Sequence, residues 1–128
     1  MKKELADKLD KIVKEISKNK KVMVIYLFGS QVTGRAREDS DVDIAVILKN
    51  PNDKDESFVA RFWSDKLDVH CFHKLPLLIQ FRIFKYGKVL FVRDKKFLHM
   101  LKVNVLGYYL DFADYINDFY RRALKNVR

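Results

Sequence analysis

Two pairs of residues between positions 27 and 43 have the types and spacing to do chemistry together. Gly29 and Ser30 end an apolar run, and Asp41 and Asp43 follow after ten intervening residues, at the start of a second apolar run. Residues two apart on a β-strand point to the same face, so the two aspartates should project together. Neighbouring carboxylates repel each other and resist dehydration, and a divalent cation such as Mg²⁺ relieves both costs. The pattern therefore indicates a magnesium site, although an isolated Asp-x-Asp pair can also be two surface acids.

The glycine–serine pair is suited to a phosphate. Gly29 allows the backbone to approach a ligand closely, and Ser30 begins a predicted short helix whose free N–H groups and dipole favour an anion. Arg35 and Arg37 are further candidates for phosphate contact, or else solvated charges of a loop. The two glycines of this stretch have the spacing of a P-loop, but the lysine and the hydroxyl residue of that motif are missing. We therefore expect a phosphoryl-transfer site of a different kind.

Asp68 is the third carboxylate of interest, because it lies in an apolar run over residues 67–72. If this run pairs beside strand 41–48, Asp68 reaches the face of the other two aspartates. There it could share the metal and accept a proton from an attacking hydroxyl. Alternatively, it begins its strand and faces water. His70 shares its face and could assist the acid, although a histidine in such a strand more often packs.

The spacing of apolar residues predicts the elements that position these groups. We expect helices over residues 2–20, 30–37, 54–64, 75–85 and from about 94 to the end, and strands over 22–28, 41–48, 67–72 and 88–92. Strand 41–48 is apolar on both faces, which is typical of a covered central strand, and strand 88–92 is a candidate edge. The expected fold is one α/β domain over residues 1–128, with a mixed four-stranded sheet flanked by helices.

The last predicted helix carries two apolar stripes. One consists of Leu101, Val105, Tyr108, Phe112, Tyr115 and Phe119, and the other of Tyr109, Ala113, Ile116, Tyr120 and Leu124. One stripe can cover the protein's own sheet, whereas two require a second surface. That surface is either a deep groove in the same domain or a protein partner, for which Tyr108, Phe112, Tyr115 and Phe119 are the candidate contacts.

Composition limits the class of protein. The 128 residues are 48% hydrophobic with a net charge of +9, which favours a globular domain with polyanionic ligands or an acidic partner. The basic residues are spread along the chain, so we do not predict specific DNA binding. The single cysteine excludes an internal disulfide framework, no apolar run reaches the roughly 18 residues of a membrane span, and the charged N-terminal residues do not form a signal sequence. We expect a cytoplasmic location.

The pair Gly29-Ser30, ten residues and Asp41-Val42-Asp43 resembles the GSx10DxD signature of the DNA polymerase β-like nucleotidyltransferase superfamily. With its small size, the chain resembles a minimal nucleotidyltransferase (MNT), the partner of HEPN proteins in bacterial and archaeal toxin–antitoxin pairs. The resemblance implies Asp41 and Asp43 as Mg²⁺ ligands, Gly29 and Ser30 as phosphate contacts, and Asp68 as the third carboxylate. It also implies ATP as the donor and transfer of AMP to a tyrosine of a HEPN ribonuclease toxin, a modification that silences the toxin. We expect the two proteins to form a hetero-oligomer.

Two other functions remain open at this stage. An enzyme of the same fold could modify a small molecule such as an aminoglycoside antibiotic, although such enzymes usually carry an additional helical domain and 128 residues leave little room for one. Alternatively, the chain could be a binding module that neutralises its partner by contact through the last helix, without chemistry.

Overall fold

The computed structural model describes residues 3–29 and 41–125. Along the chain it contains helix α1 (Lys3–Ser17), strands β1 (Val22–Phe28) and β2 (Val42–Leu48), helix α3 (Asp53–Ala60), strand β3 (Leu67–Cys71), the 3₁₀ turn η1 (Phe72–Lys74), helix α4 (Leu77–Tyr86), strand β4 (Lys88–Val92) and helix α5 (Lys95–Lys125). The helix predicted over residues 30–37 lies outside the described residues.

The four strands form one mixed sheet in the order β3-β2-β1-β4. Strand β1 runs antiparallel to both β2 and β4, whereas β3 runs parallel to β2. The predicted α/β fold class with a mixed four-stranded sheet is confirmed, β2 is an inner strand, and β4 is an edge strand as expected. Strand β3 forms the opposite edge, directly beside the strand that carries Asp43.

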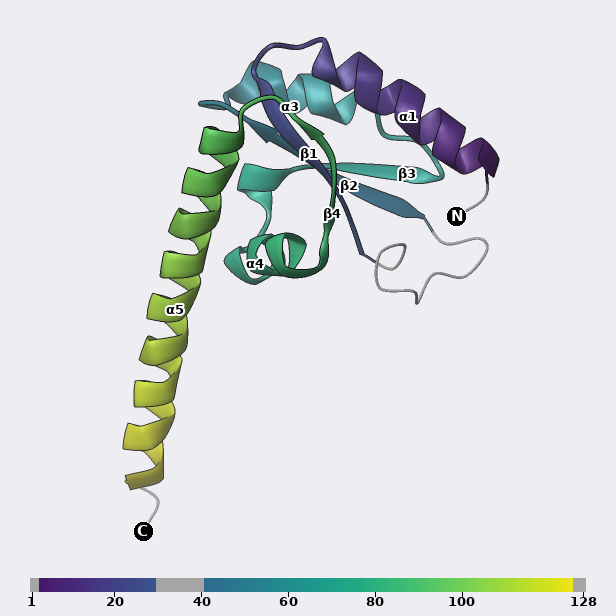
Figure 1. Ribbon diagram of the computed structural model, residues 1–128. Helices are drawn as coiled ribbons and strands as arrows, with labels where there is room; N and C mark the ends of the chain where they lie inside the picture. Colours follow the sequence, from purple (N-terminus) through teal and green to yellow (C-terminus); the bar gives the residue numbers. More distant parts are fainter. Residues whose placement is uncertain (1–2, 30–40, 126–128) are drawn as a thin grey trace.

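Each face of the sheet is covered by its own set of helices (Figure 1). Strand alternation sends Val42, Ile44 and Val46 to the face that packs against α1 and Val59 of α3. Ala45 of the same strand faces the opposite layer, formed by α4 and the first part of α5. Both faces of β2 are therefore buried, as its continuous apolar sequence indicated.

Element ends differ from the predicted ones where local hydrogen bonding overrides the apolar pattern. The helix predicted over 54–64 ends at Ala60, because the amides of residues 61, 62 and 63 bond to carbonyls three residues earlier and tighten the chain into a turn. Its start is fixed by a capping box between Asn52 and Asp55. Helix α4 begins at Leu77, directly after Pro76, rather than at residue 75.

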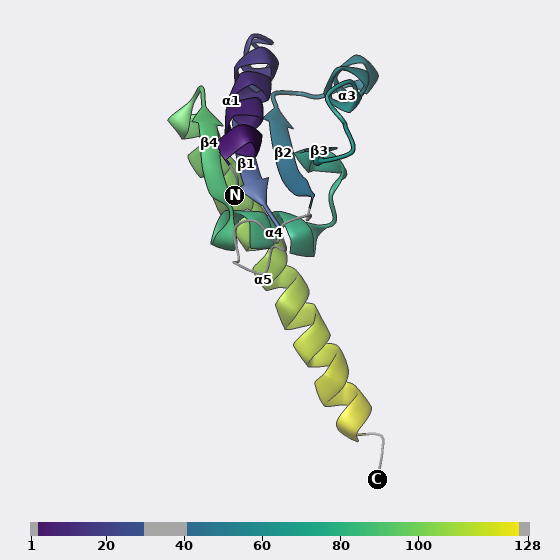
Figure 2. The ribbon, with the colours of Figure 1, turned by 90° about the vertical axis from the view of Figure 1, so that its right-hand side faces the viewer.

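Helix α5 has 31 residues, which corresponds to about 46 Å. It begins beside the sheet, passes α4 and continues away from the rest of the protein (Figures 1 and 2). Leu98 and Val105 are its buried side chains, and Tyr109 stacks on Phe81 of α4 with ring centroids 3.9 Å apart. Among the described residues, no helix is long and apolar enough to cross a membrane.

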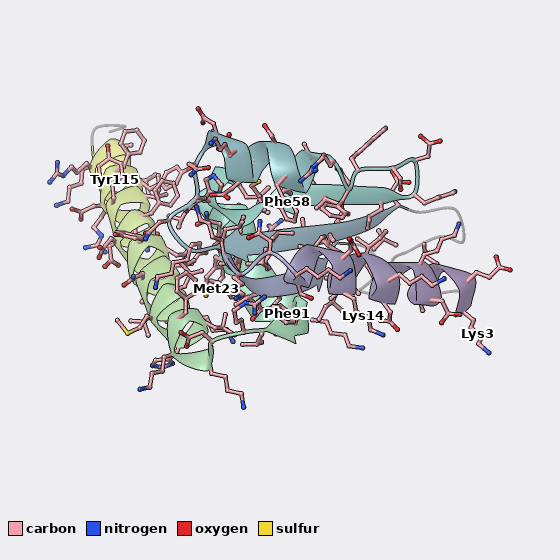
Figure 3. The ribbon with its side chains drawn as sticks, turned by 90° about the horizontal axis from the view of Figure 1, so that it is seen from above. Lys3, Lys14, Met23, Phe58, Phe91 and Tyr115 are labelled. Atoms are coloured by element: carbon pink, nitrogen blue, oxygen red, sulfur yellow. The ribbon has the colours of Figure 1, made fainter. Side chains whose placement is uncertain are left out.

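The two apolar stripes of α5 are only partly covered by the described part of the chain: Leu101, Val105 and Tyr109 pack against it, whereas most of the later aromatic residues do not. Tyr108, Phe112, Tyr115 and Phe119 are each more than half exposed. The view from above places Tyr115 on α5, well apart from the core residue Met23 (Figure 3). Of the two surfaces considered for this helix, the groove is therefore excluded for these four residues, and they form an exposed aromatic stripe.

Candidate active site

Two carboxylates meet on neighbouring strands. Asp43 of β2 and Asp68 of β3 are register partners in the parallel ladder, so their side chains leave the same face of the sheet side by side. His70 follows two residues later on that face, and its Nε2 lies 3.4 Å from Asp43 Oδ1 and 3.2 Å from Asp68 Oδ2. One ligand atom from each of the three residues lies within 4.8 Å of the others. The structure thus brings Asp43 and Asp68 together and adds an imidazole to them.

The glycine bend packs directly against this cluster. Gly29 follows β1 with a φ of +82°, a conformation that other residues rarely adopt. Its neighbour Phe28 is the register partner of Asp43, and a Cβ atom on Gly29 would lie 2.6 Å from Asp43 Oδ2. A glycine is therefore favoured here, because another residue would be strained at this φ and its Cβ would displace the nearby carboxylate.

A cavity of about 260 Å³ opens beside Gly29, on the side of α4. Phe28 lines it from the end of β1, and Arg82 and Tyr86 line it from α4. The cavity combines apolar walls with one cation, a composition that suits part of a nucleotide. The sequence carries no signal for these two α4 residues, because neither belongs to a motif and their proximity to Gly29 arises only in the fold.

Of the predicted metal ligands that the structure describes, Asp41 does not join the cluster. Asp41 stands immediately before β2 and is exposed, and it is not one of the three clustered residues. Because it precedes the strand, the alternation that directs Asp43 does not fix the direction of its side chain. Ser30, Arg35 and Arg37 lie outside the described residues, so their roles stay predictions.

The cluster is accessible to a ligand. The side chains of Asp43, Asp68 and His70 are 27%, 44% and 29% exposed. A hydrogen bond with Asp43 raises the pKa of His70 above its usual value, the negative charges of Asp68 and Asp43 add to this effect, and partial burial opposes it. Carboxylate oxygens and an imidazole nitrogen are donors that divalent cations accept, so these residues fit a divalent metal ion.

A second polar cluster holds α3 in place beside β3. Asp55 pairs with Lys21 at the start of β1, and Glu56 Oε1 lies 3.1 Å from both His73 Nε2 and Lys74 Nζ of η1. The hydrogen bond from Lys21 is the main reason that the pKa of Asp55 is lowered. These contacts connect the two ends of the segment that contains β3, and they thereby help to position Asp68.

Residues 10–96 match the sequence model of the family described as polymerase beta, nucleotidyltransferase. The chain belongs to this nucleotidyltransferase family. The matched range contains the glycine bend, both strands of the acidic cluster and the cavity beside α4, and it ends where α5 begins. No curated protein sequence matches the chain significantly.

Solved structures share the fold over nearly the whole chain. A toxin–antitoxin structure with AMP-PNP matches 90% of this chain and 98% of its own, at 18% identity and a TM-score of 0.68. The MntA–HepT toxin–antitoxin structure matches 91% and 98%, at 20% identity and a TM-score of 0.64. A tri-AMPylated Shewanella oneidensis HEPN toxin in complex with MNT antitoxin matches 90% and 95%, at 16% identity and a TM-score of 0.64. At these identities the likeness shows the fold.

Proposed function

We propose that this chain is a Mg²⁺-dependent adenylyltransferase that transfers AMP from ATP to a tyrosine of a HEPN-type toxin and acts as its antitoxin in the cytoplasm. The observation that carries the proposal is the pair of carboxylates, Asp43 and Asp68, beside the Gly29 bend in a member of the nucleotidyltransferase family. Paired acids next to a closely approaching backbone are what metal-assisted phosphoryl transfer needs.

The proposed roles of Asp43, Asp68 and Gly29 follow from their positions, and those of Asp41, Ser30, Arg35 and Arg37 follow from the sequence motif. Asp43 and Asp68 hold the metal together with Asp41, and Gly29 and Ser30 contact the phosphates of ATP, with Arg35 and Arg37 as further phosphate contacts. Bound Mg²⁺ supplies positive charge that offsets the charge of the triphosphate. The close approach of Gly29 to Asp43 keeps the phosphate contacts and the metal ligands adjacent.

The chemical step is an in-line displacement at the α-phosphorus of ATP. The acceptor oxygen attacks phosphorus, the bond from this phosphorus to the bridging oxygen of the β-phosphate breaks, and pyrophosphate leaves. Asp68 takes the proton of the acceptor hydroxyl. It suits this role because its side chain is more exposed than that of Asp43, 44% against 27%, and an incoming acceptor can reach it.

The exposed stripe of Tyr108, Phe112, Tyr115 and Phe119 supports a protein acceptor. These side chains lie on a helix that extends beyond the sheet and α4, and large amphipathic aromatics are typical anchors of interfaces. The structures that share this fold include toxin–antitoxin complexes, one with AMP-PNP and one whose HEPN toxin is tri-AMPylated. A HEPN-type partner within a hetero-oligomer is therefore the proposed acceptor.

Incubation with ATP labelled at the α-phosphate and a HEPN-type toxin from the same genome tests the proposal. Asp43→Asn and Asp68→Asn should each abolish labelling of that protein while thermal unfolding shows a folded domain. Asp10→Asn, on the exposed face of α1, is the matched control and should label normally. Labelling that persists in both site variants contradicts the proposal.

Neutralisation by binding alone is the second candidate, and the exposed α5 stripe favours it because binding there needs no catalytic residue. In that case Asp43→Asn still protects cells from the toxin, whereas Tyr108→Ala combined with Phe112→Ala does not. If Asp43→Asn loses protection while it still binds the toxin, chemistry is required.

A further inference from the structure

We propose that His70 is an additional protein ligand of the metal held at Asp43 and Asp68, and that it makes this site bind divalent transition ions such as Co²⁺ and Zn²⁺ more tightly than Mg²⁺. The inference rests on the proposed function in placing the metal at these two aspartates. It adds a ligand and a metal preference that the paired carboxylates alone do not provide.

The distances fit a shared ion. Ligand atoms held at about 2.1 Å from one metal are separated by about 3.0 Å in octahedral geometry and by about 3.4 Å in tetrahedral geometry. His70 Nε2 lies 3.2 Å from Asp68 Oδ2 and 3.4 Å from Asp43 Oδ1. These two separations match those between ligands of one ion, and one ligand atom from each of the three residues lies within 4.8 Å of the others.

The imidazole is held with this nitrogen toward the acids. His70 lies two residues beyond Asp68 on the shared face of β2 and β3, and its ring packs against Phe28 with centroids 5.5 Å apart. Its side chain is 29% exposed, which is close to the 27% of Asp43, so the two ligands lie at a similar depth. A ring positioned by packing loses less freedom when a metal binds.

The chemistry of the ligand atoms determines which metal ions the site prefers. Mg²⁺ is a hard cation that favours oxygen and retains its waters, whereas Co²⁺ and Zn²⁺ accept imidazole readily. A histidine that only hydrogen-bonds to the acids would affect the binding of all these ions similarly. A histidine that ligates the metal affects the transition ions selectively, and this difference separates the two roles.

Titration calorimetry of the full chain with Co²⁺ alone and with Mg²⁺ alone tests the inference. His70→Asn should weaken Co²⁺ binding by about tenfold or more, in the range seen when a metal site loses a supporting contact, and change Mg²⁺ binding by less than about threefold. His99→Ala, on an exposed position of α5, is the control and should change neither. The visible absorption of bound Co²⁺ should also change in the His70 variant alone.

A second variant keeps a ligand at the same position. His70→Asp should retain Mg²⁺ binding and lose the preference for Co²⁺, which a variant that merely unfolds cannot do. Equal weakening of both ions by His70→Asn, or weakening of neither, overturns the inference. If His70→Asn gives either of those two results but the wild-type protein transfers AMP, the inference fails and the proposed function stands. If His70→Asn selectively weakens Co²⁺ binding but the wild-type protein transfers no AMP, the proposed function is refuted and the metal preference is supported.

Discussion

Replacing Gly29 with alanine tests how the glycine bend and the acidic cluster depend on each other. The residue has a φ of +82°, and a Cβ atom would lie 2.6 Å from Asp43 Oδ2, well inside ordinary contact distance. The carboxylate is the far end of a side chain, so it can swing aside. The substitution should therefore displace a metal ligand while the fold survives.

The unfavourable φ of residue 29 determines the expected loss of stability, and the displaced Asp43 carboxylate determines the expected loss of metal affinity. A non-glycine residue in the left-handed region costs about 1–2 kcal/mol, and the stiffer unfolded chain of alanine offsets about 0.4–1 kcal/mol of this. We expect Gly29→Ala to lower the free energy of unfolding by about 1 kcal/mol, or the Tm by about 4 °C. Clearing the contact moves the Asp43 oxygen by most of an ångström, which should weaken metal binding about tenfold or more.

Gly107→Ala is a matched control with the opposite expected sign. Gly107 lies within α5, and nothing lies within 4 Å of the position its Cβ would take, so alanine should stabilise the helix by up to about 1 kcal/mol and leave metal binding unchanged. Denaturant unfolding and metal titration of the three proteins measure both effects. Unchanged metal affinity in Gly29→Ala, or the same sign of stability change in both variants, refutes the reasoning.

Two further predictions concern groups outside the acidic cluster. Asp55 has a lowered pKa, chiefly through its hydrogen bond with Lys21, so its contribution to stability is present above the ordinary aspartate value of about 3.9 and is lost as the pH falls through the folded value. Chemical unfolding should therefore show Asp55→Asn as less stable than wild type from pH 7 to 5, with a difference that shrinks below about pH 4; a difference that grows on acidification contradicts this. Burial raises the pKa of the Cys71 thiol, so iodoacetamide should alkylate it more slowly than free cysteine at pH 8, and unfolding in urea should remove the delay. Alkylation as fast as that of free cysteine would show that the thiol is not protected.

The sheet could be predicted because the residue pattern of β2 shows that both faces of this strand are buried. Val42, Ile44 and Val46 alternate with Asp43 and Ala45, and strand periodicity alone assigns the two faces. The sequence predicts that Asp68 lies near Asp43 only if β3 pairs with β2, and the sequence alone does not determine this pairing. That choice is made by the packing of the whole domain.

Two features could not be read from the sequence for a physical reason. The spacing of His70 gave its face, but not its distance from Asp43, which depends on the parallel register of two separate segments. The apolar stripes of α5 have the same sequence pattern whether another part of this chain or a partner protein buries them. Periodicity shows that a face is apolar, and only the fold shows that Tyr108 and Phe112 remain exposed.

From residue 117 to residue 125, every side chain of α5 is exposed. Exchanges in this segment therefore leave the sheet, the glycine bend and the acids undisturbed. Sequence change there carries no packing penalty, and Phe119 is the one residue of the proposed interface stripe that it reaches. Exchanging the segment for that of a relative would accordingly probe the contribution of Phe119 and its neighbours to the proposed interface, with the folded domain unchanged.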